Sequence, residues 1–236
     1  MSNRIQKSAL ISVYNKDGID KIAGKLASLK VKILSTGGTE KYLNSQGIKT
    51  EKVEDLTNYP SIFGGRVKTL HPKIFGGILY RRDFDNDVVE RGNLDIPKID
   101  YVIVDLYPFE ETVNSSKSHQ EIIEKIDIGG ISLIRAAAKN YKDVVCVSSI
   151  EQYEQFLIDL DENKGNFSLS KRKEYAINSF KLSSNYDNQI NNYLQNGNLE
   201  KKTKLRYGEN PHQEGYFNGN LDEIFEKISG KDLSYN

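Results

Sequence analysis

Short apolar runs alternate with helical patterns over the first 150 residues of the chain. Four runs rich in β-branched side chains are typical of buried strands, and they are SALISVY (8–14), VKILST (31–36), YVIVDLYPF (101–109) and DVVCVSS (143–149). Between the first two runs, apolar residues recur at helical spacing at Ile19, Ile22, Ala23, Leu26 and Leu29. Asn15 precedes this helix as a candidate N-cap. Because strands and helices alternate, the pattern predicts a mainly parallel sheet flanked by helices, an α/β fold.

The pattern changes after residue 149. Residues 151–163 and 169–196 carry apolar side chains spaced among polar ones and predict two helices. The polar and charged stretch NGNLEKKTK (196–204) is typical of a linker, and the irregular segment LRYGENPHQEGYF (205–217) follows it. We therefore expect a first domain over residues 1–197, and a linker with the start of a second domain over residues 198–236.

Charge and composition narrow the class of protein. The 236 residues include 33 basic and 33 acidic side chains, so no overall field favours nucleic acid or an acidic membrane surface. The sequence predicts neither a membrane span nor a secretory signal, because it has no 18-residue apolar run and no charged-then-apolar leader. The single cysteine, Cys146, lies in an apolar run. It predicts a buried thiol in a reducing compartment, and we expect a cytoplasmic protein.

The segment LSTGGTEKYL (34–43) is a candidate phosphate-binding turn. A strand runs directly into Thr36, Gly37, Gly38 and Thr39, and a predicted helix follows. The glycines permit a tight turn with exposed N–H groups, and a helix N-terminus favours an anion. An ordinary strand-to-helix turn capped by Thr39 is the alternative. The segment lacks the lysine of a Walker motif, which argues against a nucleoside triphosphatase.

The segment GGRVKTLHPKIFGGIL (64–79) is a second candidate for ligand binding. Arg66 and Lys68 flank Val67, so in an extended segment both cations project to one side, where they could hold a phosphate or polarise a carbonyl. Its two glycine pairs would let the backbone approach a ligand closely. A solvated pair of cations on a loop is the alternative. His71, beside a proline, is more typical of a structural histidine.

Two further segments place polar side chains at element ends. In IVDLYPFEETV (103–113), a strand ends at Asp105 and Tyr107, at the carboxyl edge of the sheet where ligands bind in open α/β folds. In EKIDIGGISLIRAAAKN (124–140), Asp127 lies near the start of a helix and Lys139 near its end, which also suits the helix dipole. If residues 131–139 form an unbroken helix, a rise of about 12 Å separates its ends. Three alternatives remain open: the helix breaks, a ligand spans the gap, or Lys139 acts across a dimer interface.

The segments STGGT, GGRVKTLHPKIFGGIL, LYPF, IDIGG and RAAAKN, in this order and spacing over residues 8–153, carry a resemblance to a known family. The chain resembles the amino-terminal inosine monophosphate (IMP) cyclohydrolase domain of the bifunctional purine-biosynthesis family PurH (ATIC). LRYGENPHQ (205–213) resembles the start of the family's second domain, the AICAR transformylase. The resemblance implies a methylglyoxal-synthase-like (MGS-like) three-layer α/β domain with a mainly parallel sheet, followed by helices and a short truncated tail.

The resemblance implies the last reaction of purine synthesis. The formamido ribotide FAICAR closes its ring, loses water and becomes IMP. The attacking carboxamide nitrogen is a poor nucleophile, so the site must orient the reacting groups and stabilise the oxygen that gains charge. We expect no metal or cofactor for this step, since 10-formyltetrahydrofolate serves only the transformylase. That activity is expected to be absent from so short a chain, and the resemblance implies a homodimer that binds neither nucleic acid nor membrane.

The family's site residues are implied at matching positions. The catalytic residues would be Lys68 and Tyr107, acting on the formyl oxygen, and Asp127 and Lys139, moving protons. Substrate binding is implied for Tyr14, Asn15, Lys16, Thr36, Gly37, Gly38, Thr39, Arg66, Val67, Thr69, Val104, Asp105, Ile128, Gly129 and Gly130. Val104 and Asp105 would face the base. Arg206 and Tyr207 would bind the AICAR ribotide in an intact second domain.

Two positions depart from the family pattern. Asp105 stands where relatives commonly have asparagine, so the donor of an amide is replaced by an acceptor-only carboxylate. Phe75 stands where relatives often have histidine. Two alternative functions share the MGS-like fold: methylglyoxal synthase, and a non-catalytic regulatory module that binds a phosphate ligand.

Overall fold

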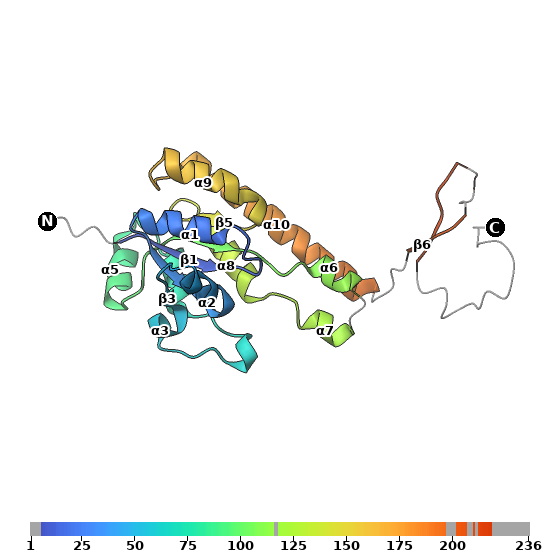
Figure 1. Ribbon diagram of the computed structural model, residues 1–236, viewed down its shortest axis with the longest axis horizontal. Coiled ribbons are helices and arrows are strands. Elements are labelled where there is room, and N and C mark those ends of the chain that lie inside the picture. Colours follow the sequence, from blue (N-terminus) through green and yellow to red (C-terminus); the bar gives the residue numbers. More distant parts are fainter. Residues whose placement is uncertain (1–5, 116–117, 197–201, 207–209, 211, 219–236) are drawn as a thin grey trace. The chain divides into compact units, whose positions relative to one another are not determined.

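The computed structural model describes residues 6–115, 118–196, 202–206, 210 and 212–218 (Figure 1). The chain divides into two compact units. The first comprises residues 1–107 and 127–185, and the second comprises residues 108–126 and 186–236. Every predicted site residue from Tyr14 to Lys139 belongs to the first unit.

A five-stranded parallel sheet forms the centre of the first unit. Its strands are β1 (Ser8–Ser12), β2 (Lys32–Ser35), β3 (Glu51–Lys52), β4 (Ile99–Val104) and β5 (Val145–Val147), in the order β3-β2-β1-β4-β5. All neighbouring strands are parallel. Strand β4 is buried along its whole length, as expected of a strand covered on both faces. The predicted parallel α/β fold is confirmed, while the two-residue strand β3 was not predicted.

Helices cover both faces of this sheet; α1, α2, α8, α9 and α10 were predicted, whereas α3, α4 and α5 were not. They are α1 (Ile19–Ser28), α2 (Gly37–Ser45), α3 (Val53–Thr57), α4 (Pro72–Leu79), α5 (Asp85–Asn93), α8 (Gly129–Lys139), α9 (Tyr153–Glu162) and the first part of α10 (Leu169–Asn196). Successive residues of β1 point to opposite faces: Ala9 and Ile11 join a core with α1 and α9, whereas Leu10 joins one with α4 and α8 (Figure 1). The result is the predicted three-layer arrangement.

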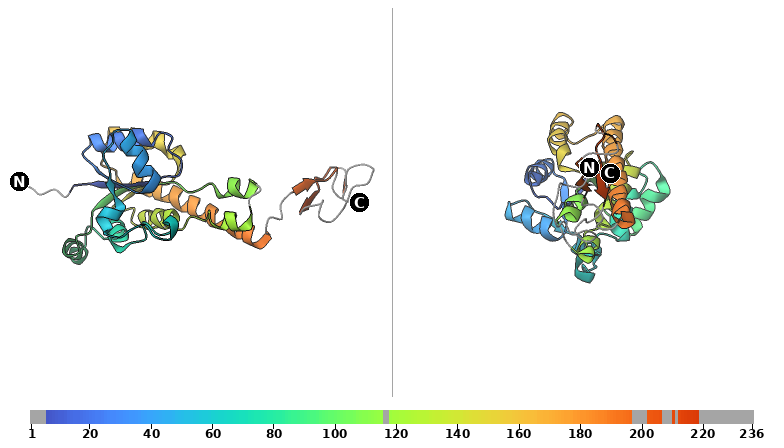
Figure 2. Two further views of the ribbon diagram at one scale, coloured as in Figure 1. Left: turned by 60° about the horizontal axis from the view of Figure 1, so that its bottom comes forward. Right: turned by 90° about the vertical axis from the view of Figure 1, so that its right-hand side faces the viewer.

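The second unit has a small aromatic core. It contains α6 (Phe109–Asn114), α7 (His119–Ile123), the end of α10, and an antiparallel pair of strands, β6 (Lys202–Lys204) and β7 (Tyr216–Asn218) (Figure 2). The ring of Phe109 makes edge contacts with Tyr186 and Tyr193, with centroids 6.1 and 5.8 Å apart. The segment 205–217, expected to be irregular, therefore ends in a paired strand. The predicted domain boundary at residues 197 and 198 lies outside the described residues.

Two local predictions were wrong. Asn15 does not cap α1, whose N-cap is Gly18 in the left-handed region at φ 74°. The side chain of Asn15 instead accepts a hydrogen bond from the N–H of Asp17 at 2.9 Å. Helix α2 is not capped by Thr39 either, because Thr36 is the N-cap residue and its side chain makes no capping bond.

Cys146 is buried in the sheet, as predicted, and its burial raises the pKa of the thiol to about 12. In the part of the chain that the structure covers, no helix has the length and apolar character needed to cross a bilayer.

Candidate functional site at the carboxyl edge of the sheet

The predicted site residues follow strands that end at one edge of the sheet. In the register, Ile11 lies opposite Ser35, and Ser12 lies opposite Val104. The segments that leave β1, β2 and β4 therefore begin side by side at the carboxyl ends of parallel strands. This edge is where open α/β folds bind ligands.

The turn between β2 and α2 exposes backbone N–H groups at the edge. Gly37 has φ 56°, a left-handed conformation that other residues adopt at a cost. A Cβ atom added to Gly38 would meet nothing within 4 Å, so the backbone there is open to a ligand. The hydroxyl of Thr36 donates a hydrogen bond to Oε1 of Glu54 at 2.9 Å. The left-handed Gly37 and the open backbone at Gly38 suit the binding of an anion at the N-terminus of α2, whereas the Thr36 hydroxyl is already donated to Glu54, whose carboxylate opposes an anion.

Thr39 has a structural role at this turn. Its buried hydroxyl accepts a hydrogen bond from the N–H of Val13 at 3.1 Å and donates one to the carbonyl of Val13 at 3.0 Å. The side chain therefore ties α2 to the segment that follows β1. Its contribution to the site is to hold these two segments together.

The segment that carries Lys68 is a tight turn, so the predicted extended conformation was wrong. The backbones of Ile62 and Val67 exchange hydrogen bonds of 3.1 and 3.4 Å across the turn. Gly64 and Gly65 permit this because both have positive φ, at 64° and 96°. The side chain of Lys68 folds over Gly65: a Cβ atom on Gly65 would lie 2.7 Å from Cε of Lys68.

The ammonium group of Lys68 lies beside the phosphate-binding turn. Its Nζ is 3.7 Å from the position that a Cβ atom on Gly37 would occupy. Its positive charge also acts on the carboxylate of Asp127. Lys68 thus lies beside the turn at the start of α2 and acts electrostatically on the carboxyl group at the start of α8.

The second glycine pair serves packing instead of ligand binding. Gly76 and Gly77 lie in α4, and a Cβ atom on Gly77 would meet the carbonyl oxygen of Pro97 at 2.7 Å. A Cβ on Gly76 would meet Ile96 at 3.0 Å. The prediction of ligand approach at this pair was therefore wrong.

Two other residues of this segment, Phe75 and His71, also have structural roles. Phe75 is partly buried and packs against the core under α4 and α8. His71 is the N-cap of α4, and its Nδ1 accepts a hydrogen bond from the N–H of Lys73 at 3.1 Å. The structural interpretation of His71 is confirmed.

The start of α8 holds Asp127 and joins it to Thr69. The N–H of Gly130 donates a hydrogen bond to Oδ1 of Asp127 at 2.7 Å. Burial raises the pKa of the Asp127 carboxyl, and the N–H of Gly130 and the charge of Lys68 oppose that rise. A Cβ atom on Gly129 would lie 3.3 Å from the hydroxyl oxygen of the buried Thr69. The structure therefore brings Lys68, Thr69 and Asp127 together.

Lys139 lies away from this group. Helix α8 runs unbroken from Gly129 to Lys139, so its ten residue steps give a rise of about 15 Å. The side chain of Lys139 is exposed at the far end. A break in the helix is thereby excluded as the means of bringing Asp127 and Lys139 of one chain together.

A second cluster forms where β1 and β4 end. The rings of Tyr14 and Tyr107 are in contact, with centroids 4.3 Å apart and planes tilted by 40°. Both carboxylate oxygens of Asp105 accept backbone hydrogen bonds, from the N–H groups of Tyr14 and Asn15. Burial raises the pKa of Asp105, and these N–H groups and the charge of Lys16 oppose the rise. Burial also lowers the pKa of the Lys16 ammonium, an effect that Asp105 opposes.

The other predicted site residues differ in their exposure to solvent. Val104 is buried in the sheet, whereas Ile128 is 58% exposed beside Asp127. Arg66 is exposed, and Val67 is partly buried in the turn with Lys68. Arg206 is exposed in the second unit, and Tyr207 lies outside the described residues.

Sequence reasoning missed two residues at this edge. Glu54 accepts the hydroxyl of Thr36, and Leu106 would lie 3.0 Å from a Cβ on Gly130. Leu106 stands within LYPF and was passed over as an apolar residue. No motif signalled Glu54, because its partner is eighteen positions away in the chain.

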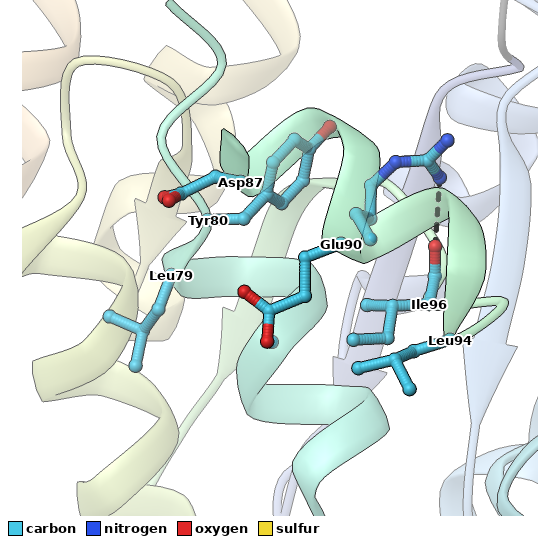
Figure 3. A pocket seen from close by; sticks show the side chains of 8 residues that line it. Leu79, Tyr80, Asp87, Glu90, Leu94 and Ile96 are labelled. Atoms are coloured by element: carbon cyan, nitrogen blue, oxygen red, sulfur yellow. Dashed lines mark hydrogen bonds between the residues drawn. The ribbon is translucent and has the colours of Figure 1, made fainter. Parts of the chain in front are cut away.

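One cavity of about 270 Å³ lies between α4 and α5 (Figure 3). It is lined by Gly76, Leu79, Tyr80, Asp87, Glu90, Arg91, Leu94 and Ile96. Arg91 donates a hydrogen bond to the carbonyl of Ile96 at 2.8 Å at its rim. None of the predicted site residues lines this cavity. Within the described ranges, no three His, Cys, Asp or Glu side chains are grouped so that they could hold a metal ion.

Comparisons with known proteins cover most of the chain. A family model described as "MGS-like domain" matches residues 18–132, and one described as "AICARFT/IMPCHase bienzyme" matches residues 137–236. The bifunctional purine biosynthesis protein PurH of Bacteroides thetaiotaomicron is 56% identical over 242 residues, which cover all of this chain and 48% of that protein. The protein of the same name from Clostridioides difficile is 42% identical, over 98% of this chain and 48% of its own length. The chain spans about half the length of these curated relatives.

A solved structure has the same fold. The structure titled "Crystal structure of ForH" matches with a TM-score of 0.69 and 31% sequence identity. The match covers 80% of this chain and 98% of that one.

Proposed function

Since the chain belongs to the family of bifunctional purine biosynthesis proteins PurH, we propose that it is an IMP cyclohydrolase, which closes the ring of FAICAR with loss of water to give IMP. One observation carries the proposal. The ammonium group of Lys68 lies beside the open turn at Gly37, and its charge acts on the partly buried carboxylate of Asp127. A candidate anion site thus has a cation beside it, and that cation acts electrostatically on a carboxylate of raised pKa.

The first requirement of the reaction is to hold the ribotide. Its phosphate would bind the N–H groups of the Gly37 turn, at the start of the nine-residue helix α2. Arg66, exposed near Lys68, would add a second cation. The rest of the substrate would extend toward Asp127, where the exposed side chain of Ile128 offers an apolar surface.

The second requirement is to activate the formyl group. Ring closure places negative charge on the formyl oxygen as the carboxamide nitrogen attacks. The Lys68 ammonium would stabilise that charge, and the hydroxyl of Tyr107, which is 37% exposed at the edge, would donate a hydrogen bond to the same oxygen. The loss of water then needs a proton donor.

Asp127 would move the proton. A carboxyl whose pKa is raised by burial is better matched to proton exchange near neutral pH than an ordinary aspartate. It would pass one proton from the attacking carboxamide nitrogen to the formyl oxygen; the second proton of the departing water comes from the formamide N–H, whose nitrogen forms the new C=N bond of the ring. We propose that none of these steps requires a metal or an organic cofactor, and that 10-formyltetrahydrofolate has no part in them.

With α8 unbroken, two of the three alternatives for Lys139 remain: a ligand that spans the gap, and action across a dimer interface. Because the unbroken α8 separates Lys139 from Asp127 by about 15 Å of rise, we propose that Lys139 reaches the site of a partner copy in a homodimer. Turnover per chain should then fall on dilution, in step with the dimer fraction measured by analytical ultracentrifugation. Unchanged turnover from a chain shown to be monomeric would contradict this part of the proposal.

Ultraviolet absorbance during incubation with FAICAR tests the function. We expect the 236-residue chain to form IMP, and Lys68→Ala to lose about 10²- to 10³-fold in kcat while its circular dichroism stays native. Lys73→Ala, on the same segment but inside α4, is the matched control and should keep its rate. Saturable binding of FAICAR without turnover would favour the regulatory module instead. Elimination of phosphate from a triose phosphate would favour methylglyoxal synthase.

A further inference from the structure

The carboxylate of Asp105 is occupied on both oxygens by the backbone of the segment after β1. Oδ1 accepts a hydrogen bond from the N–H of Tyr14, and Oδ2 accepts one from the N–H of Asn15 at 2.9 Å. Two successive N–H groups thus point at one carboxylate, which leaves the side chain turned toward the chain itself.

A carboxylate suits this arrangement better than an amide would. Asp105 offers two acceptor oxygens when it is ionised, whereas asparagine offers one oxygen and places an NH₂ group at the other position. In an asparagine variant, that NH₂ would face the N–H of Tyr14 or Asn15, donor against donor. One backbone N–H would lose its partner at a partly buried site.

The other polar groups of this segment are also engaged. The Lys16 ammonium folds back onto the carbonyls of Val13 and Tyr14, the latter at 3.0 Å. Thr39 binds both backbone groups of Val13. Hydrogen bonds to its backbone therefore fix the conformation of this segment. The side chain of Tyr14 projects from it.

The side chain of Tyr14 contacts Tyr107, a residue with a proposed catalytic role. Its ring is 51% exposed and lies against the ring of Tyr107, with centroids 4.3 Å apart. Tyr107 follows Asp105 by two positions, so one short stretch of chain supplies both the carboxylate that fixes the Tyr14 backbone and the ring that meets the Tyr14 side chain.

We propose that Asp105 is a positioning residue, whose two oxygens hold the Tyr14–Asn15 backbone so that the Tyr14 ring fixes Tyr107 at the site. Its effect on the reaction rests on the proposed function, whereas its effect on the Tyr14 segment does not. Both oxygens of Asp105 are engaged by the backbone, so its proposed task is to hold the segment and not to read the base, the role that the resemblance implies for its position.

A tryptophan reporter tests the structural part without substrate. The chain has no tryptophan, so Tyr14→Trp introduces a single fluorophore at the segment. We expect Asp105→Asn, added to this variant, to lower the anisotropy of the tryptophan and to raise its quenching by acrylamide about twofold or more, because the fluorophore is no longer held.

Asp87→Asn is the matched control, since Asp87 also accepts a backbone N–H, that of Arg81 at 2.9 Å, on the distant helix α5. Unchanged anisotropy and quenching in a folded Asp105→Asn variant would overturn the proposal. If Asp105→Asn does not fold, Asp105→Ser, whose hydroxyl offers one acceptor oxygen, is tested in its place.

Steady-state kinetics with FAICAR test the catalytic part. A misplaced Tyr107 should lower kcat roughly ten- to hundredfold in Asp105→Asn, with KM changed less than twofold. In a Tyr14→Ala background the same substitution should have little further effect, since the contact through which Asp105 acts is already gone. A raised KM with unchanged kcat, or effects that multiply in the double variant, would instead assign Asp105 to direct recognition of the base. If the wild-type chain forms no IMP at all, the proposed function fails, and the fluorescence result still decides whether Asp105 holds the segment.

Discussion

The backbone N–H of Gly130 donates a 2.7 Å hydrogen bond to Oδ1 of Asp127, and a Cβ atom on Gly130 would come within 2.6 Å of the other oxygen of the same carboxylate. The glycine therefore does two things for Asp127. It supplies a donor, and it leaves the space that the carboxylate occupies.

Gly130→Ala should displace the Asp127 carboxylate and reduce IMP formation. Contacts of 2.6 Å are not tolerated, so the carboxyl or the start of α8 must shift, and a shift of about 1 Å costs on the order of 10²-fold in rate. Gly92→Ala is the matched control: Gly92 also lies in a helix, α5, and its added methyl would meet nothing within 4 Å. Both variants gain up to about 1 kcal/mol of helix propensity. Equal rates in the two variants, measured by ultraviolet absorbance, would contradict the role given to Gly130.

Asp127→Asn should lower activity while it raises stability at neutral pH. Burial makes the pKa of Asp127 higher in the folded than in the unfolded chain, so the native state binds the proton more tightly between those two values. The free energy of unfolding therefore falls as pH rises through that interval, and it stays lower above it. An uncharged amide escapes this penalty.

Urea denaturation of the wild type and of Asp127→Asn at several pH values checks this expectation. The gain in stability should be present above the folded-state pKa and should shrink as pH falls through it. The wild-type rate should decline over the same acid range, because the base becomes protonated. A variant that is less stable than the wild type at neutral pH would show that the ionised carboxylate stabilises the fold.

Gly65→Ala should affect the site through Lys68. The added methyl would lie 2.7 Å from Cε of Lys68, so the end of the lysine side chain must shift from its place beside Gly37. Gly64→Ala is a stringent control. Gly64 also has positive φ, at 64° within the left-handed region, so its alanine carries a backbone cost of about 1–2 kcal/mol, and its methyl would meet nothing within 4 Å.

Gly65→Ala should have the lower melting temperature of the two, because its φ of 96° lies outside the left-handed region, and it should also have the lower rate. We expect kcat to fall about tenfold or more in Gly65→Ala relative to Gly64→Ala, as measured with saturating FAICAR. If the rates fall together, the backbone conformation of the turn, and not the place of Lys68, controls the reaction.

Asp100→Asn should weaken the fold at the opposite edge of the sheet. Asp100 is 5% exposed, and its carboxylate accepts the N–H of Ser8 at 3.1 Å and pairs with Arg82 at 2.7 Å and Lys98 at 3.3 Å. Loss of its charge leaves the largely buried Arg82 without a counter-ion, and such losses cost about 3 kcal/mol or more. Asp83→Asn, which breaks an exposed pair with Lys142, should leave the urea midpoint unchanged. Equal midpoints for the two variants would refute the prediction.

Local sequence determined the elements of the fold. The alternating apolar runs predicted four of the five strands, and the spacing of Ile19, Ile22 and Leu26 predicted α1, because both patterns record which side chains face a core. The placing of Asp127 near the start of a helix and Lys139 near its end was also correct. These features depend on neighbours within a few positions, which a sequence displays directly.

Only the tertiary structure decided what the glycines and polar side chains of the motifs do. Gly65 and Gly77 look alike in the sequence, yet the first lies under Lys68 and the second under the carbonyl of Pro97. The hydroxyl of Thr36 donates a hydrogen bond to Glu54, 18 positions away in the chain. Asp105 accepts one from the N–H of Tyr14, 91 positions away. The sequence by itself determined the sheet, its helices and the carboxyl edge of the sheet, where the polar residues that follow the strands lie. The partners across that edge were settled only when parallel strands brought distant segments into hydrogen-bonding distance, because contacts between distant segments follow from the topology of the chain and leave no local pattern.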